Sequence, residues 1–69
     1  MNTSLNYIGK ELHTTVNGVL FIERIYGITS RGFYQTSLTN TMTGNVTYNQ
    51  LDPETLQDIL DEGRAKLVA

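Results

Sequence analysis

Large apolar side chains recur at every second position through much of the chain, which is the spacing of β-strands. Residues 19–26 (VLFIERIY) are apolar on both sides of such a strand. One side carries Val19, Phe21 and Ile25, and the other carries Leu20, Ile22 and Tyr26. Because strands that are apolar on both faces are normally central and buried, this segment is expected to be the central strand of a sheet.

Asn17 and Gly18 precede this strand and predict a two-residue hairpin turn, since a type I′ turn needs positive φ at both central positions. Residues 11–16 would then pair with the central strand, in a register where the two residue numbers of each cross-strand pair sum to 35. Glu11 would face Arg24 as an opposite-charge pair. One face of the sheet would carry Leu12, Thr14, Val16, Val19, Phe21 and Ile25, and a more mixed face would carry His13, Thr15, Leu20, Ile22 and Tyr26.

Two further strands are expected after the central one. Residues 27–32 are bracketed by glycines and predict a six-residue loop, followed by a strand over 33–40. A reversal at 41–44, with Gly44 in the left-handed conformation, leads to a strand over 45–51. The predicted fold class is mainly β with α: a small antiparallel meander or SH3-like barrel of four to five strands, closed by one C-terminal helix.

Asp52, Pro53 and Glu54 predict the start of that helix, as an N-cap, a first-turn proline and an acid at the positive end of the dipole. Gly63 could end the helix, but the apolar stripe stays in phase beyond it, so a helix over 53–68 is predicted. The stripe consists of Leu56, Ile59, Leu60, Gly63 and Leu67. The helix is expected to cover the mixed face of the sheet.

Length and composition narrow the structural options. The 69 residues are expected to form a flexible lead-in over 1–6 and a single domain over 7–69. With no Cys and one His, disulfides and a four-ligand Cys/His zinc site are excluded, and neither a metal nor a cofactor is expected. Chains of this size often gain stability by self-association, so a homo-oligomer is expected. The first residues lack the basic start and apolar run of a signal peptide, which predicts a cytoplasmic protein without a membrane span.

The net charge is −2 and is unevenly distributed. Residues 1–51 hold three bases and two acids, whereas residues 52–62 hold five acids and no base. General nucleic-acid binding is therefore disfavoured, because it needs many Lys and Arg side chains on phosphates. The acids of the predicted helix that face outward are Glu54, Asp58, Asp61 and Glu62. They form either a solvated face or a contact for a basic partner protein.

The predicted 27–32 loop is a candidate anion site, because Thr29, Ser30 and Arg31 offer hydroxyls, amides and a guanidinium. It matches no phosphate-loop motif, and an ordinary polar loop is the alternative. Four aromatic residues lie near the loop or on neighbouring strands and are expected either to stack on bases or to pack in the core: Tyr26, Phe33, Tyr34 and Tyr48. Of these, Tyr26 and Tyr34 are assigned to the candidate ligand site. No nucleophile with an orienting group accompanies His13, so no enzyme is predicted.

Three further features carry a family resemblance: Ile8, Gly9 and Lys10 before the first strand, Thr43, Gly44 and Asn45 at a late turn, and LDPETL (51–56) opening the helix. With the successive hairpins, they resemble small phage-encoded SH3-like barrel proteins of the accessory or anti-defence kind. The chain departs from that pattern in having four clear strands and a full terminal helix. The resemblance implies a non-catalytic inhibitor or sequestering protein. We therefore expect a binding module that holds a small anionic, nucleotide-like ligand between subunits or blocks a host protein. The alternative is a small β-barrel that binds nucleic acid.

Overall fold

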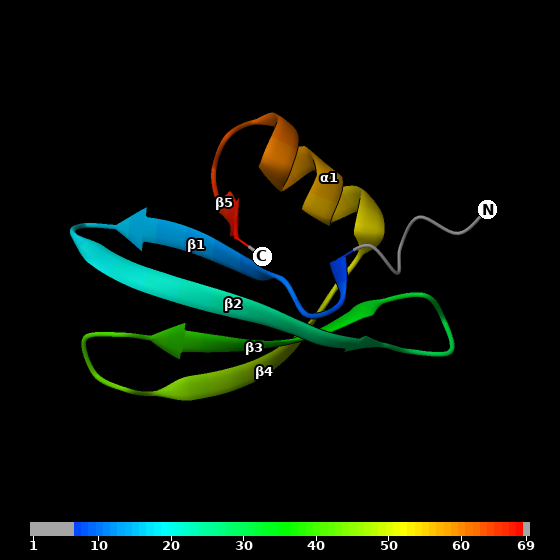
Figure 1. Cartoon of the computed structure of the whole chain (residues 1–69), viewed down its shortest axis with the longest axis horizontal. Helices are drawn as coiled ribbons and strands as arrows, with labels where there is room; N and C mark the ends of the chain where they lie inside the picture. Colours follow the sequence, from blue (N-terminus) through cyan, green and yellow to red (C-terminus); the bar gives the residue numbers. More distant parts are fainter. Residues whose placement is uncertain (1–6, 69) are drawn as a thin grey trace.

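The fold is a single five-stranded antiparallel sheet with one helix packed against it (Figure 1). The structure is a computed structural model and describes residues 7–68, so the predicted lead-in over 1–6 lies outside the described residues. The elements in chain order are β1 (Glu11–Val16), β2 (Val19–Ile28), β3 (Tyr34–Asn40), β4 (Val46–Leu51), α1 (Pro53–Asp61) and β5 (Lys66–Val68). The sheet order β4-β3-β2-β1-β5 places β2 in the centre, as predicted.

The first hairpin has the predicted turn and register. Asn17 and Gly18 have φ values of 51° and 80°, which only the left-handed region provides. All six pairs from Glu11 opposite Arg24 to Val16 opposite Val19 follow the expected sum of 35. The later reversal is also confirmed, with Gly44 at φ 80°.

The predicted continuation of the helix to Val68 is wrong, because α1 ends at Asp61. Gly63 has φ 71°, and the Gly63 N–H donates to the Leu60 carbonyl at 3.2 Å. The Arg64 N–H donates to the Ile59 carbonyl at 3.0 Å, which completes a Schellman cap. The chain then turns back, and β5 pairs with β1.

The sheet is open rather than closed into a barrel. Its two edges are β4 and β5, which lie at opposite sides of the sheet in Figure 1. The SH3-like barrel that the resemblance implies is therefore not confirmed, whereas the mainly β fold with five antiparallel strands and one helix is.

A β-bulge lengthens the central strand. The pairing of β2 with β3 skips Tyr26, so that Ile25 faces Thr36 and Ile28 faces Tyr34. The extra residue brings Ile28 onto the same face as Ile25, where strict alternation would have put it on the other face. The predicted loop over 27–32 is consequently wrong in extent, since β2 runs to Ile28.

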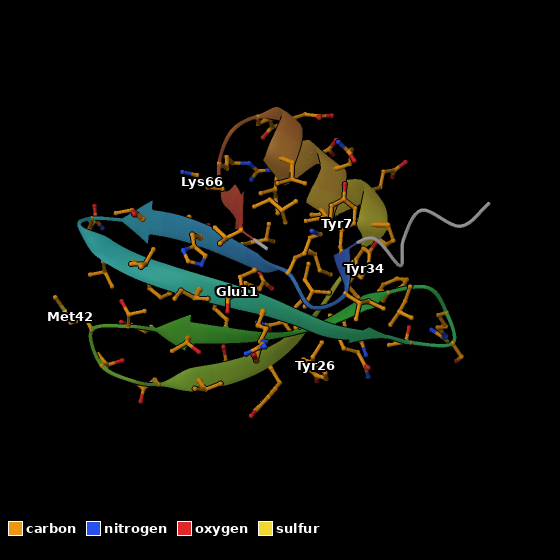
Figure 2. The ribbon with its side chains drawn as sticks, in the orientation of Figure 1. Tyr7, Glu11, Tyr26, Tyr34, Met42 and Lys66 are labelled. Carbon is orange, nitrogen blue, oxygen red and sulfur yellow. The ribbon has the colours of Figure 1, made fainter. Side chains whose placement is uncertain are left out.

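The helix packs on the face of the sheet that carries Leu12, Ile25 and Tyr34, here called the helix face. Leu56 of α1 is fully buried against these three side chains. Figure 2 shows Tyr34 and Tyr7 beneath the helix, and Tyr26 on the side of the sheet away from the helix. The prediction that the helix covers the mixed face is wrong. Within residues 7–68 no helix covers that mixed face, which is here called the open face. It includes Ile22, Arg24 and Tyr48.

Candidate functional site

A hollow of about 630 Å³ lies on the open face, across the middle of the sheet. The register builds it in rows, because residues paired across neighbouring strands project from the same face. One row runs from Arg24 through Ser37 to Tyr48, and the next runs from Ile22 through Thr39 to Val46. The full lining is Glu11, Ile22, Arg24, Tyr26, Ser37, Thr39, Val46 and Tyr48.

Arg24 is the only cationic side chain in this lining. It is exposed, and its guanidinium has no hydrogen-bond or ion-pair partner within residues 7–68. Glu11 faces Arg24 in the register, as predicted, but its carboxylate accepts a hydrogen bond from His13 Nε2 at 2.9 Å. The expected contact between the Glu11 and Arg24 side chains is therefore not formed, and the guanidinium is available to an incoming anion.

Two tyrosine rings border the hollow. Tyr26, at the bulge, is 51% exposed, and Tyr48, on the edge strand, is 72% exposed. Both also line a smaller adjoining hollow of about 380 Å³ together with Gln35, Asn49 and Gln50. Exposed aromatic rings beside an unpaired guanidinium suit a planar, negatively charged group, which stacks on the rings while its charge meets the cation.

The residues predicted from sequence to bind a ligand do not share one surface. Tyr34 is 1% exposed in the core and lies edge-to-face with Tyr7, with ring centroids 5.9 Å apart. Tyr26 projects from the opposite face of the sheet. Ser30 and Arg31 are exposed in the turn between β2 and β3.

Thr29 is occupied within that turn. Its N–H donates to the Phe33 carbonyl at 2.7 Å, and its Oγ1 accepts from the Phe33 N–H at 3.1 Å. Its carbonyl accepts from the Gly32 N–H at 2.9 Å. These bonds close a tight turn of the chain upon itself. The Thr29 N–H is therefore used in local structure, whereas the Thr29 hydroxyl accepts a hydrogen bond and keeps its own proton to donate.

Arg24 was absent from the predicted site, and Tyr48 was predicted only as one of four aromatics that stack bases or pack in the core. The signal that would have found them is the register of β3 with β4, which brings Tyr48 into the row of Arg24. From sequence alone the register is specified only in the first hairpin, where a single dipeptide sets the turn.

The four acids predicted to meet a partner protein lie exposed on α1 and at its end. Two of them have local partners. Asp61 Oδ1 accepts from Gln57 Nε2 at 2.9 Å, and Glu62 Oε1 lies 2.7 Å from Arg64 Nε. Within residues 7–68, no three His, Asp or Glu side chains are grouped in a way that could hold a metal ion. All four acids are exposed, and Glu62 lies just beyond the last residue of α1.

Comparison of the chain with protein-family models, with curated proteins and with solved structures gave no match. The resemblance to phage-encoded SH3-like proteins accordingly stays a prediction. In the described part of the chain, no helix combines the length and the apolar character needed to cross a membrane.

Proposed function

We propose that the protein is a non-catalytic binding module that holds a small, planar, anionic ligand of the nucleotide type on the open face of its sheet. The observation that carries this proposal is the row of Arg24, Ser37 and Tyr48, with Tyr26 beside it, across a hollow that no element of residues 7–68 covers. The resemblance to small sequestering proteins of bacteriophages supports the same class.

Each side chain of the hollow has a role in this proposal. The base stacks on Tyr48 or Tyr26, since every base presents a π-face to an aromatic ring. The phosphate accepts hydrogen bonds from the Arg24 guanidinium, whose planar fork matches phosphate oxygens. The hydroxyls of Ser37 and Thr39 are free to donate to the ligand from the same face.

The absence of catalysis is part of the proposal. The one imidazole, on His13, is hydrogen-bonded to Glu11 rather than to a hydroxyl. A nucleophile, a base and an orienting group in mutual contact are what acyl or phosphoryl transfer by side chains requires. A protein that acts by occupancy alone needs only the affinity of the hollow.

Calorimetric titration of the purified chain with the four common nucleoside monophosphates tests the proposal. We expect binding by at least one, with affinity lowered about tenfold or more by Arg24→Gln, because hydrogen bonds to a charged group contribute roughly 1.5–3 kcal/mol. Tyr48→Ala should weaken binding to a similar extent through lost stacking. Arg31→Gln, in the turn, is the matched control and should leave affinity unchanged. Absence of binding at millimolar nucleotide, or equal loss with Arg31→Gln, would refute the proposal.

Single-stranded nucleic acid is the alternative ligand for the same face, because Tyr26 and Tyr48 offer two stacking platforms. An oligonucleotide that binds much more tightly than the mononucleotide, with an affinity that falls steeply with salt, would favour it. Equal affinity for both would favour the small ligand.

The second candidate function is inhibition of a partner protein by binding to it. The exposed outer acids of α1 carry it, as a negative row suited to a basic surface. Its test is to neutralise Glu54 and Asp58, which have no side-chain partner within residues 7–68. Loss of a defined protein complex in the E54Q/D58N variant, with nucleotide binding retained, would favour this function.

A further inference from the structure

The outer edge of β4 carries unpaired backbone groups. The Asn40 N–H donates to the Asn45 carbonyl at 2.9 Å, so these facing residues occupy the position of a hydrogen-bonded pair just before the β3–β4 ladder. In an antiparallel ladder such pairs alternate with pairs whose backbone groups point away. The N–H and C=O groups of Val46, Tyr48 and Gln50 therefore point out of the sheet.

This edge lacks the devices by which sheets normally avoid pairing with other chains. Such devices are charged side chains, proline, bulges or very short strands. β4 spans six residues without a charge or a proline, and its pairing with β3 shows no register shift. Residues 32–51 contain no Asp, Glu, Lys, Arg or His at all. The opposite edge, β5, is protected, because it is three residues long and includes Lys66.

We infer that β4 pairs antiparallel with β4 of a second copy of this chain, about a two-fold axis through Tyr48. The residue numbers of each pair across the axis then sum to 96. Tyr48 faces Tyr48 of the second copy, and Val46 faces Gln50 of the second copy. These are the residues whose backbone groups point outward, and each facing pair exchanges two hydrogen bonds. Two five-stranded sheets become one continuous sheet.

The charge pattern favours a second copy as the occupant of this edge. A two-fold axis brings each side chain near its own counterpart, so a charged residue close to the axis would meet a like charge. β4 has none. On the helix face, Thr47 would face Asn49 of the second copy, and both are exposed and neutral. The strand is thus complementary to itself.

The small core favours a permanent partner of this kind. Within residues 7–68 five side chains are almost completely buried: Leu12, Ile25, Tyr34, Thr36 and Leu56. A chain of this size without disulfides often gains stability by self-association. Pairing through β4 extends the backbone ladder without disturbing the packing of α1 on the sheet.

The pairing also joins the two hollows. Tyr48 lines the hollow and stands at the axis, so the ring of the second copy would border the same concave surface. The second copy would thereby contribute a side chain to the site. The pairing itself rests on the strand edge and not on the proposed ligand, so it is testable on the ligand-free protein.

Two measurements on the purified full chain test the inference. Light scattering should give the mass of two copies, and amide exchange followed by NMR should show the amides of Val46, Tyr48 and Gln50 exchanging at least about tenfold more slowly than exposed turn amides. A monomer at about 0.1 mM would overturn the inference. A dimer in which these three amides exchange as fast as those of the turns would also overturn it.

A matched pair of double variants probes the register. Both carry Asn49→Lys on the exposed helix face of β4, outside the lining of the 630 Å³ hollow, and they differ only at Thr47. T47K/N49K places like charges opposite each other across the axis, whereas T47E/N49K places opposite charges there. The dimer dissociation constant should be at least about tenfold higher for the first variant. Equal dissociation constants for the two variants would contradict the register.

Discussion

Leu12 and Leu20 test which face of the sheet the helix covers, because they lie on neighbouring strands and project from opposite faces. Leu12 is 2% exposed in the core beneath α1, and Leu20 is partly exposed on the open face. Replacing Leu12 with Ala removes three buried carbon atoms, about 2.4 kcal/mol at roughly 0.8 kcal/mol each. The residual cavity raises the expected loss to about 3 kcal/mol. For Leu20→Ala, water fills the vacated space, and we expect about 1 kcal/mol.

Urea unfolding, followed by far-UV circular dichroism at one fixed protein concentration, measures both losses. A chain of 69 residues has a free energy of unfolding of about 3–10 kcal/mol, so a loss of about 3 kcal/mol for Leu12→Ala is a large part of it. Both variants should keep the wild-type slope of unfolding free energy against urea concentration. An unchanged slope means that the same amount of surface is exposed on unfolding. A loss for Leu20→Ala equal to or larger than that for Leu12→Ala would refute the assignment of the covered face.

Three other substitutions test local features by the same unfolding assay. Gly63→Ala should destabilise by about 1 kcal/mol because φ is 71°, whereas in a continuous helix the same change would stabilise. The sign of the change in unfolding free energy therefore tells whether the helix ends before Gly63. Asp52→Ala should cost about 1 kcal/mol, since Asp52 Oδ1 accepts from the Glu54 N–H, while Asp58→Ala on the exposed helix should change little. Thr36→Val should cost about 1–2 kcal/mol, because the Thr36 hydroxyl donates to Glu23 Oε2 at 2.6 Å; an unchanged stability would contradict that bond.

The parts of the fold that short-range chemistry determines were predictable from sequence. Asn17 and Gly18 form a two-residue turn that allows only one register for the flanking strands. All the pairs of that hairpin have this predicted register. Asp52 and Pro53 likewise defined where the helix begins. In each case one or two residues specify a local conformation that long-range packing does not override.

The covered face was not predictable by strict alternation, because a bulge at Tyr26 changes the count. It brings Ile28 alongside Ile25 and Tyr34, and this wider apolar surface lies next to Leu51, where the chain leaves the sheet for the helix. The end of the helix was mispredicted for a related reason. Leu67 stays in phase with the helical stripe, but Gly63 adopts φ 71° and Leu67 reaches the core from a strand instead.

The candidate site depends on pairings between strands far apart in sequence. Arg24 and Tyr48 are separated by 24 residues and share a row only through Ser37 between them. The site predicted from sequence was centred on one glycine-bracketed loop, where the functional groups are adjacent in the chain. In an open sheet, by contrast, a binding surface is assembled across strands, so the register must be known first.

A nuclear magnetic resonance titration of the ¹⁵N-labelled chain with a nucleoside monophosphate tests the central claim most directly, since it reports on every backbone amide at once. The account predicts that shifts concentrate on the open face, at Arg24, Tyr26, Ser37 and Tyr48, and leave the helix and residues 29–32 unchanged. Shifts confined to that turn or to α1, or none at millimolar nucleotide, would contradict it.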